Sequence, residues 1–263
     1  MPTWLFLLLA TASLCSLFYY YQFIRELRED SDTSNAPIVS LYKWPDFVVG
    51  GLLVVFFLQL ILMPSDAPQV VNFDILIKGA QFYLCLVVAI FGFLIFRGMN
   101  PLHLFGFAPI ELRRRIFLGL KWLLIAYPVL MVTQIISYHL FSDQAEPQPV
   151  VMFLIENDGW KDRLAVILLA LVAAPLAEEV IFRGYLYGMI CSFGGRWSAI
   201  CTSSLLFAAI HLHWPSMAGL FLLGVVLALL YEKTKSLWVP LIMHSVFNGI
   251  SVCMAIFWPE LLK

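Results

Sequence analysis

Three short polar sets interrupt the apolar second half of this sequence. In chain order they are Glu178, Glu179 and Arg183, then Phe207 and His211, then His244 and Asn248. An ionisable side chain inside a transmembrane helix costs about 2.5–3.5 kcal/mol on insertion scales, so it usually marks a functional site. These residues are therefore the candidates for an active site within a membrane.

Helical spacing groups the polar residues by face. Glu179 and Arg183 are four positions apart, so they share a helix face and are expected to form an ion pair. Glu178 is rotated by about 100° from Glu179 and points elsewhere. His244 and Asn248 are also four positions apart and share a face. Each of these helices is thus expected to present a compact polar patch to its neighbours.

The residue types suit hydrolysis of an amide by an activated water molecule. Glu178, which has no partner at helical spacing, is a suitable general base, and His211 can share the water with it. His244 and Asn248 are hydrogen-bond donors on one face that can stabilise an oxyanion on a substrate carbonyl. No serine or cysteine occurs in a GxSxG-type context, so a covalent nucleophile is not indicated.

A zinc-dependent version of the same chemistry is open at this point. Glu178, His211 and His244 resemble a set of zinc ligands in residue type. Their spacing is not HExxH, and they lie on three different predicted helices. The sequence does not decide between a metal-bound and a metal-free water.

The elements that carry these residues are predicted to be membrane helices. Hydrophobic residues make up 62% of the chain and charged residues 13%, far from the composition of a soluble domain. A helix crosses a bilayer core with about 20 apolar residues. The sequence therefore predicts one all-α polytopic membrane domain over 1–263 with about eight transmembrane helices, the first being a retained anchor. The expected spans are 3–24, 46–63, 70–96, 116–141, 163–192, 196–213, 215–232 and 236–258.

Basic residues predict the orientation of this bundle. With both termini outside, eleven Lys and Arg residues fall on the inner side and four on the outer side, which favours an N-out, C-out topology. The net charge of −1 gives no indication of nucleic acid as a partner. The expected partners are the lipid bilayer and a membrane-associated peptide or protein substrate.

At the polar sets the chain resembles the CPBP family of CAAX proteases and bacteriocin-processing enzymes, also called the Abi family. The family pattern is EExxxR, then FxxxH, then HxxxN or HxxxD, and the three sets named above match it in that order. Pro175, before the glutamates, and Pro240, before the last histidine, also resemble the family. The resemblance covers a predicted catalytic core at 101–258, whereas the helices of 1–100 carry no family signal.

The resemblance implies an eight-helix intramembrane endopeptidase of glutamic or metalloprotease type. Eukaryotic relatives remove the last three residues of prenylated CAAX proteins. By position, Glu178 and His211 would activate water, and His244 and Asn248 would form the oxyanion hole. Glu179, Arg183 and Phe207 would support them.

The predicted function is hydrolysis of a peptide bond in a membrane-associated or prenylated substrate. No cofactor is required for this interpretation, zinc being the alternative. The small size of the chain favours a multi-pass protein of the bacterial plasma (inner) membrane. Two other functions remain open at this point. One is a non-catalytic immunity or regulatory protein of the same fold, and the other is a proton-coupled transporter in which the buried Glu, His and Arg form a relay.

Overall fold

The structure is a computed structural model of the whole chain. It describes residues 41–63, 71–107, 111–141 and 147–261, together with 11, 13–19, 21–22 and 25 near the N-terminus. Most of the first expected span, 3–24, lies outside the described residues, so that span and the count of eight remain predictions. The orientation of the bundle in the membrane also remains a prediction.

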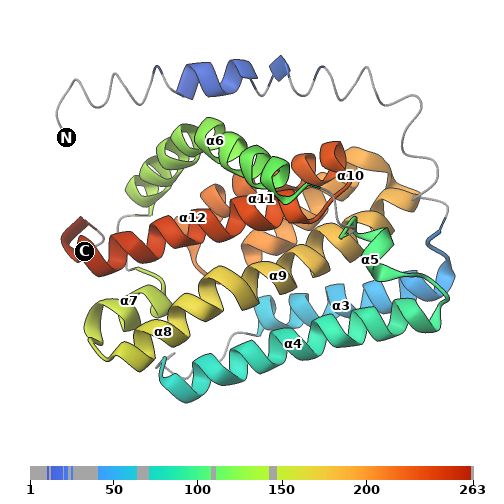
Figure 1. Cartoon of the computed structure of the whole chain (residues 1–263), viewed down its shortest axis with the longest axis horizontal. Coiled ribbons are helices and arrows are strands. Elements are labelled where there is room, and N and C mark those ends of the chain that lie inside the picture. Colours follow the sequence, from blue (N-terminus) through green and yellow to red (C-terminus); the bar gives the residue numbers. More distant parts are fainter. Residues whose placement is uncertain are drawn as a thin grey trace.

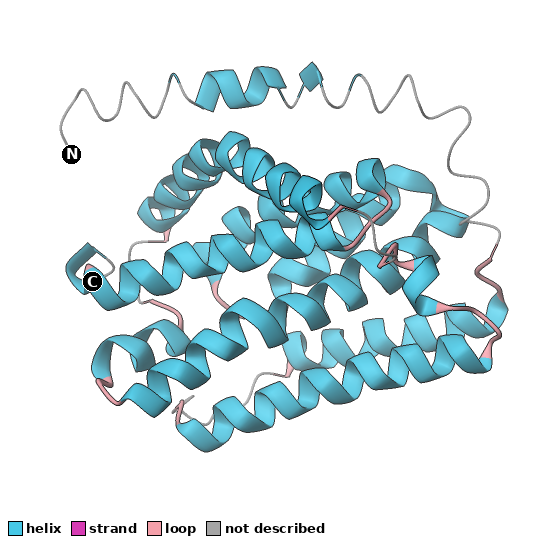
Figure 2. Ribbon diagram, in the orientation of Figure 1, coloured by secondary structure: helices cyan, strands magenta, loops and turns pink. Residues whose placement is uncertain are grey.

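The described part of the chain consists of helices joined by loops and contains no strand, as Figures 1 and 2 show. The helices are α3 (Trp44–Leu62), α4 (Phe73–Phe96), α5 (Pro101–Leu104), α6 (Leu112–Leu140), α7 (Pro149–Glu156), α8 (Trp160–Leu168), α9 (Ala174–Glu178), α10 (Tyr187–Ala209), α11 (Trp214–Thr234) and α12 (Trp238–Phe257). Two π-helical segments, η3 (Leu169–Ala173) and η4 (Glu179–Leu186), join α8 to α9 and α9 to α10, and a short 3-10 turn covers Pro259–Leu261. Six helical elements of this described part are long and apolar enough to cross a membrane. The predicted all-α polytopic membrane bundle is confirmed.

The fifth and sixth expected spans lie in one helical run of 50 residues, Trp160–Ala209. The run is interrupted at Gly195, where φ is 77° and ψ is 171°, so the chain changes direction there without a separate loop. Glycine adopts this left-handed φ without the steric cost that a Cβ would add. The predicted break between 192 and 196 therefore exists, but it is a single-residue kink.

The centre of the bundle is formed by η4 and α11. Every residue of η4 is buried, and α11 is the most enclosed of the candidate spans, with 61% of its most apolar stretch buried. The α11 helix packs against α6, α10 and α12. The carboxyl-terminal helix α12 lies alongside η3 and α9, as Figure 1 shows, so it faces the helix that carries both glutamates.

The start of α12 is held by the segment that follows α5. The carbonyl of Phe105 accepts a hydrogen bond from the Leu237 amide (3.0 Å), and the carbonyl of Gly106 accepts one from the Ser236 hydroxyl (2.8 Å). Gly106 has a φ of +66°, and a Cβ built on it would lie 1.9 Å from the backbone oxygen of Lys235. This contact fixes the first turn of the helix that carries His244.

Gly106→Ala is expected to destabilise the protein by roughly 2–4 kcal/mol, because a side chain there adds a left-handed φ penalty to a clash with rigid backbone. Thermal melting in detergent would measure the loss. Gly98→Ala is the matched control, since Gly98 has a similar φ of +73° with open space around its Cβ position. Equal losses in the two variants would show that φ, and not the close approach to Lys235, dominates.

Candidate active site

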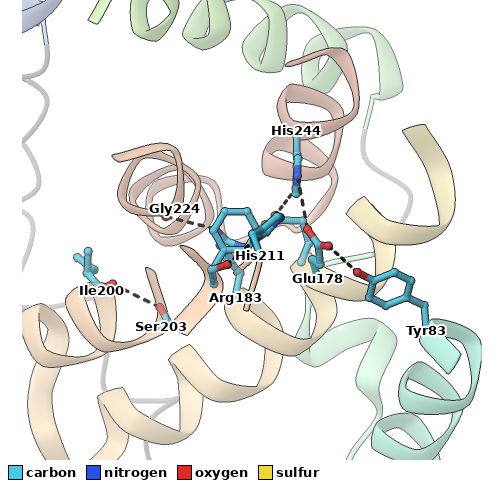
Figure 3. A network of polar contacts seen from close by, with 10 residues as sticks. Tyr83, Glu178, Arg183, Ile200, Ser203, His211, Gly224 and His244 are labelled. Carbon is cyan, nitrogen blue, oxygen red and sulfur yellow. Dashed lines mark hydrogen bonds and ion pairs between the residues drawn. The ribbon is translucent and has the colours of Figure 1, made fainter. Parts of the chain in front are cut away.

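The Glu178 carboxylate lies where α4, α9 and α12 meet. The Tyr83 hydroxyl of α4 donates a hydrogen bond to its Oε1 at 3.0 Å. Its Oε2 lies 3.6 Å from Nε2 of His244 on α12. The side chain is buried, with 5% of its surface exposed, and Figure 3 shows Tyr83 and His244 approaching it from two sides. Glu178 is thus a buried carboxylate with one hydroxyl donor and one histidine in contact.

Glu179 has a different environment from Glu178. Its Oε1 lies 3.2 Å from Nη1 of Arg183 and 2.9 Å from Nδ1 of His244, and the three side chains are almost fully buried. Arg183 also donates to the carbonyl of Gly224 on α11 at 3.5 Å. The predicted ion pair is confirmed, and the structure adds His244 as a second partner. The charge of Glu179 is therefore already balanced within the protein.

Phe207 supports three of these groups at once. Its fully buried ring packs edge-on against His211 (centroids 5.1 Å apart) and against His244 (5.6 Å). The Arg183 guanidinium carbon lies 4.3 Å from the centroid of the same ring, a cation–π distance. Phe207 therefore contacts both histidine rings and the Arg183 guanidinium.

The His211 ring is oriented by the helix that precedes it. It lies in the turn after α10, and its Nδ1 is 2.8 Å from the carbonyl of Phe207. Because a carbonyl only accepts, Nδ1 must carry the proton, and in the neutral ring Nε2 is then a hydrogen-bond acceptor. A neutral His211 can therefore accept a proton from water.

Asn248 lies on α12 one helical turn beyond His244, and its side chain contacts η3. Its amide nitrogen donates to the carbonyl of Ala170 at 2.9 Å. The structure thus brings together six of the seven predicted site residues, namely Glu178, Glu179, Arg183, Phe207, His211 and His244. Asn248 is on the same face of α12 but is held by a different partner.

The alternative zinc set consists of Glu178, His211 and His244. Within the described ranges, no group of three His, Cys, Asp or Glu side chains is placed to hold a metal ion. His244 contacts Glu179 through Nδ1, and His211 contacts the Phe207 carbonyl through its own Nδ1, so neither bond uses Nε2 of its ring. The zinc set Glu178, His211 and His244 therefore keeps Nε2 of both histidines and the Glu178 carboxylate as possible donors, and the metal-free water belongs to the proposal below.

Tyr83 is the contact that the sequence did not predict. It lies in the middle of an apolar helix in the first hundred residues, where no family motif occurs. A tyrosine in a membrane helix is not by itself a signal, because the ring is apolar and the hydroxyl finds a partner only through the tertiary fold. Its partner, Glu178, is 95 residues away in sequence.

Comparison with known proteins is consistent with this geometry. Residues 160–250 match the sequence profile of the family described as type II CAAX prenyl endopeptidase Rce1-like. The chain is 28% identical over 155 residues to the membrane-embedded CAAX protease MroQ of Staphylococcus aureus (strain USA300), which covers 55% of this chain and 61% of MroQ. It is 29% identical over 89 residues to YdiL, named as a candidate membrane peptidase of Bacillus subtilis (strain 168), covering 34% of this chain and 36% of YdiL. An uncharacterised 24.3 kDa protein of Escherichia coli is 28% identical over 158 residues, 58% of this chain and 69% of that protein.

No solved structure matches this chain significantly. The matched stretches span less than two thirds of MroQ and of YdiL. The profile match lies inside the predicted core of 101–258 and contains all three polar sets. Residues 160–250 of this chain therefore resemble the Rce1-like family of type II CAAX prenyl endopeptidases.

Proposed function

We propose that this protein is an intramembrane endopeptidase that cleaves a membrane-associated protein or peptide with a water molecule activated by Glu178 and His211. The observation that carries the proposal is the asymmetry of the two adjacent glutamates. Glu179 is neutralised by Arg183 and contacts His244, whereas among the described residues Glu178 has only the ring of His244 at ion-pair distance. A carboxylate placed in this way is available as a general base.

The proposed reaction uses Glu178 as a proton carrier. Water between Glu178 and Nε2 of His211 gives a proton to the carboxylate as its oxygen bonds to the scissile carbonyl carbon. The carbonyl oxygen becomes an oxyanion. When the carbon–nitrogen bond breaks, Glu178 returns that proton to the leaving nitrogen. The products are a carboxylic acid and an amine, which exchange a proton to become a carboxylate and an ammonium group.

His244 and Asn248 are the proposed oxyanion donors. Because Nδ1 of His244 faces the carboxylate of Glu179, a neutral ring has no proton left at Nε2. Donation from Nε2 to the substrate oxygen therefore requires a second ring proton on His244, and Glu179 at 2.9 Å is the counter-ion of this proposed imidazolium. Positive charge at this point would stabilise the developing negative charge on the substrate oxygen.

The substrate class follows from the family and from the membrane. MroQ is named a CAAX protease, and the matching family is one of CAAX prenyl endopeptidases, which supports a lipid-modified or membrane-bound substrate. The reported relatives come from bacteria, which supports the bacterial plasma membrane as the location. A prenylated substrate is one member of the proposed class, and other membrane-associated peptides are equally compatible with the site.

Mapping of protein termini in membranes tests the function without assuming a substrate. Membranes with the wild type or Glu178→Gln, at matched expression, would be compared by mass spectrometry of newly formed termini. Termini present only with the wild type would establish proteolysis and identify the substrate. Identical termini, with the variant still folded, would contradict the proposal and favour a non-catalytic regulatory protein or a proton-coupled transporter.

In the proposed reaction the attacking water is not bound to a metal ion. Metal chelators are therefore expected to leave the cleavage rate within about twofold of that of the untreated enzyme. The physical reason is that, in the proposed reaction, the Glu178 carboxylate and a neutral His211 are sufficient to activate the water. Cleavage of the identified substrate would be followed after dialysis against EDTA and 1,10-phenanthroline. Loss of activity that returns on adding Zn²⁺ would contradict the metal-free mechanism.

Tyr83→Phe is expected to lower kcat/KM by about 10-fold to 100-fold without unfolding the protein. The variant removes one hydrogen bond to the Glu178 carboxylate, and hydrogen bonds to charged groups contribute about 1.5–3 kcal/mol. Tyr127→Phe on α6 removes a hydroxyl from another membrane helix and is the matched control. Equal rates for the two variants would show that Tyr83 does not act on the base.

A further inference from the structure

The backbone carbonyl of Ala170 has an unusual hydrogen-bond partner. It lies in η3, a π-helical turn in the middle of a membrane helix, and it accepts its hydrogen bond from a side chain of another helix, the amide of Asn248 at 2.9 Å. A backbone carbonyl inside a membrane helix normally accepts from its own helix, because no water is present to replace that bond. The carbonyl of Ala170 therefore lacks the donor that its own helix normally supplies.

Two local causes leave this carbonyl without a donor from its own helix. In an α register its donor would be the amide of Ala174, but that amide donates to Leu169 in the π register. In the π register its donor would be the amide of residue 175, which is a proline and has no N–H. The π turn and Pro175 together expose the carbonyl of Ala170, and Asn248 supplies the missing donor.

This bond fixes the orientation of the Asn248 amide. The carbonyl of Ala170 only accepts, so the NH₂ group of Asn248, and not its oxygen, must face it. A primary amide has two N–H groups, and only one is used by Ala170. The bond to Ala170 does not use the second N–H, and Asn248 lies one helical turn from His244 on α12.

We propose that Pro175 is a positioning residue for the oxyanion site: by withholding an N–H from Ala170, it reserves that carbonyl for Asn248 and holds the amide with one N–H free for the substrate. This inference rests on the proposed function, because it assigns the free N–H to the substrate oxygen. The bond between Asn248 and Ala170 is a property of the fold, so one part of the test needs no catalysis.

The catalytic part of the test is Pro175→Ala. An alanine supplies the N–H that competes with Asn248 for the carbonyl of Ala170. We expect kcat to fall at least tenfold while KM stays nearly unchanged. Complete loss of an oxyanion donor lowers kcat by about 10²–10³-fold, which sets the upper bound of the expected decrease. Pro128→Ala is the matched control, since Pro128 also interrupts a membrane helix, α6, away from this site.

A proline that only shapes the helix predicts a different result. In that case Pro175→Ala and Pro128→Ala would change activity alike, or Pro175→Ala would lower the melting temperature and KM would change together with kcat. Unchanged kcat in a folded Pro175→Ala enzyme would overturn the proposal.

The structural part of the test is a double-mutant cycle on melting temperature with Pro175→Ala and Asn248→Ala. In the wild-type background Asn248→Ala leaves the carbonyl of Ala170 without a donor, and we expect a decrease of roughly 3–8 °C. In the Pro175→Ala background the new N–H takes over, so the same change should cost less than half as much. Additive decreases would overturn the proposal whether or not the protein cleaves peptides.

If the cycle shows coupling but Glu178→Gln and the wild type give identical termini, the proposed function fails while the link between Pro175 and Asn248 stands.

Discussion

Glu178→Gln is expected to lower kcat/KM for peptide cleavage by about 10²–10⁴-fold while the helical bundle stays folded, the range that general acid–base catalysis contributes. The amide of glutamine cannot accept the proton of water. The glutamine side chain is nearly the same size as that of glutamate. Its amide oxygen can still accept the hydrogen bond that the Tyr83 hydroxyl donates to Glu178 at 3.0 Å. The variant therefore removes the base and little else. Kinetics of the purified protein on the substrate identified from membranes would measure the effect.

The control for this variant is Glu260→Gln, which removes a carboxylate from an exposed position near the carboxyl terminus. It should leave both the rate and the melting temperature unchanged. A Glu178→Gln enzyme that melts as the wild type does and retains more than about a tenth of its rate would exclude Glu178 as the base. Glu179 would then have to be examined for that role.

Contacts within one turn of helix were predictable from the sequence. The spacing of Glu179 and Arg183 requires that they share a face, and the structure places them in an ion pair. The same geometry links Phe207 to His211, whose Nδ1 reaches the Phe207 carbonyl. Helical periodicity fixes such contacts because they depend on only four consecutive peptide units.

Contacts between helices were predictable in outline only. Three helices with polar patches were expected to meet, and His244 does contact both glutamates. The sequence could not assign Nδ1 of His244 to Glu179, because that depends on the rotation of α12 about its axis. It also could not indicate Tyr83, since its bond to Glu178 exists only when α4 packs on α9.

The partner of Asn248 shows a third limit. Sequence reasoning placed this residue with His244 as an oxyanion donor, and the structure shows its amide on Ala170. That bond depends on a π register in the neighbouring helix, and no periodicity of apolar residues distinguishes a π turn from an α turn. Pro175 was visible in the sequence, but its effect on a carbonyl five residues earlier requires the register to be known.

Replacement of Arg183 by methionine is expected to have the largest effect on stability, about 3–5 kcal/mol, because it leaves a buried carboxylate without its cation. Arg183 is fully buried and lies 3.2 Å from Glu179. It also packs over the Phe207 ring and reaches the Gly224 carbonyl, so it joins the glutamate helix to α10 and α11. Thermal or denaturant unfolding in detergent would measure the loss. The exposed ion pair of Asp74 and Lys78 has the same spacing and is the matched control, since such surface pairs contribute at most about 0.5 kcal/mol.

The double variant Glu179→Gln with Arg183→Met separates the charge from the packing of this side chain. If the uncompensated carboxylate causes the loss, neutralising it should recover more than half of the stability, because replacing a buried pair by neutral groups is often nearly neutral. Activity should not return with stability, since His244 would then lack the counter-ion that the proposed imidazolium needs. If the double variant is as unstable as Arg183→Met alone, the contribution of Arg183 lies in its contacts with Phe207 and Gly224. If it is both stable and active, Glu179 has no part in holding His244, and the oxyanion site depends on other donors.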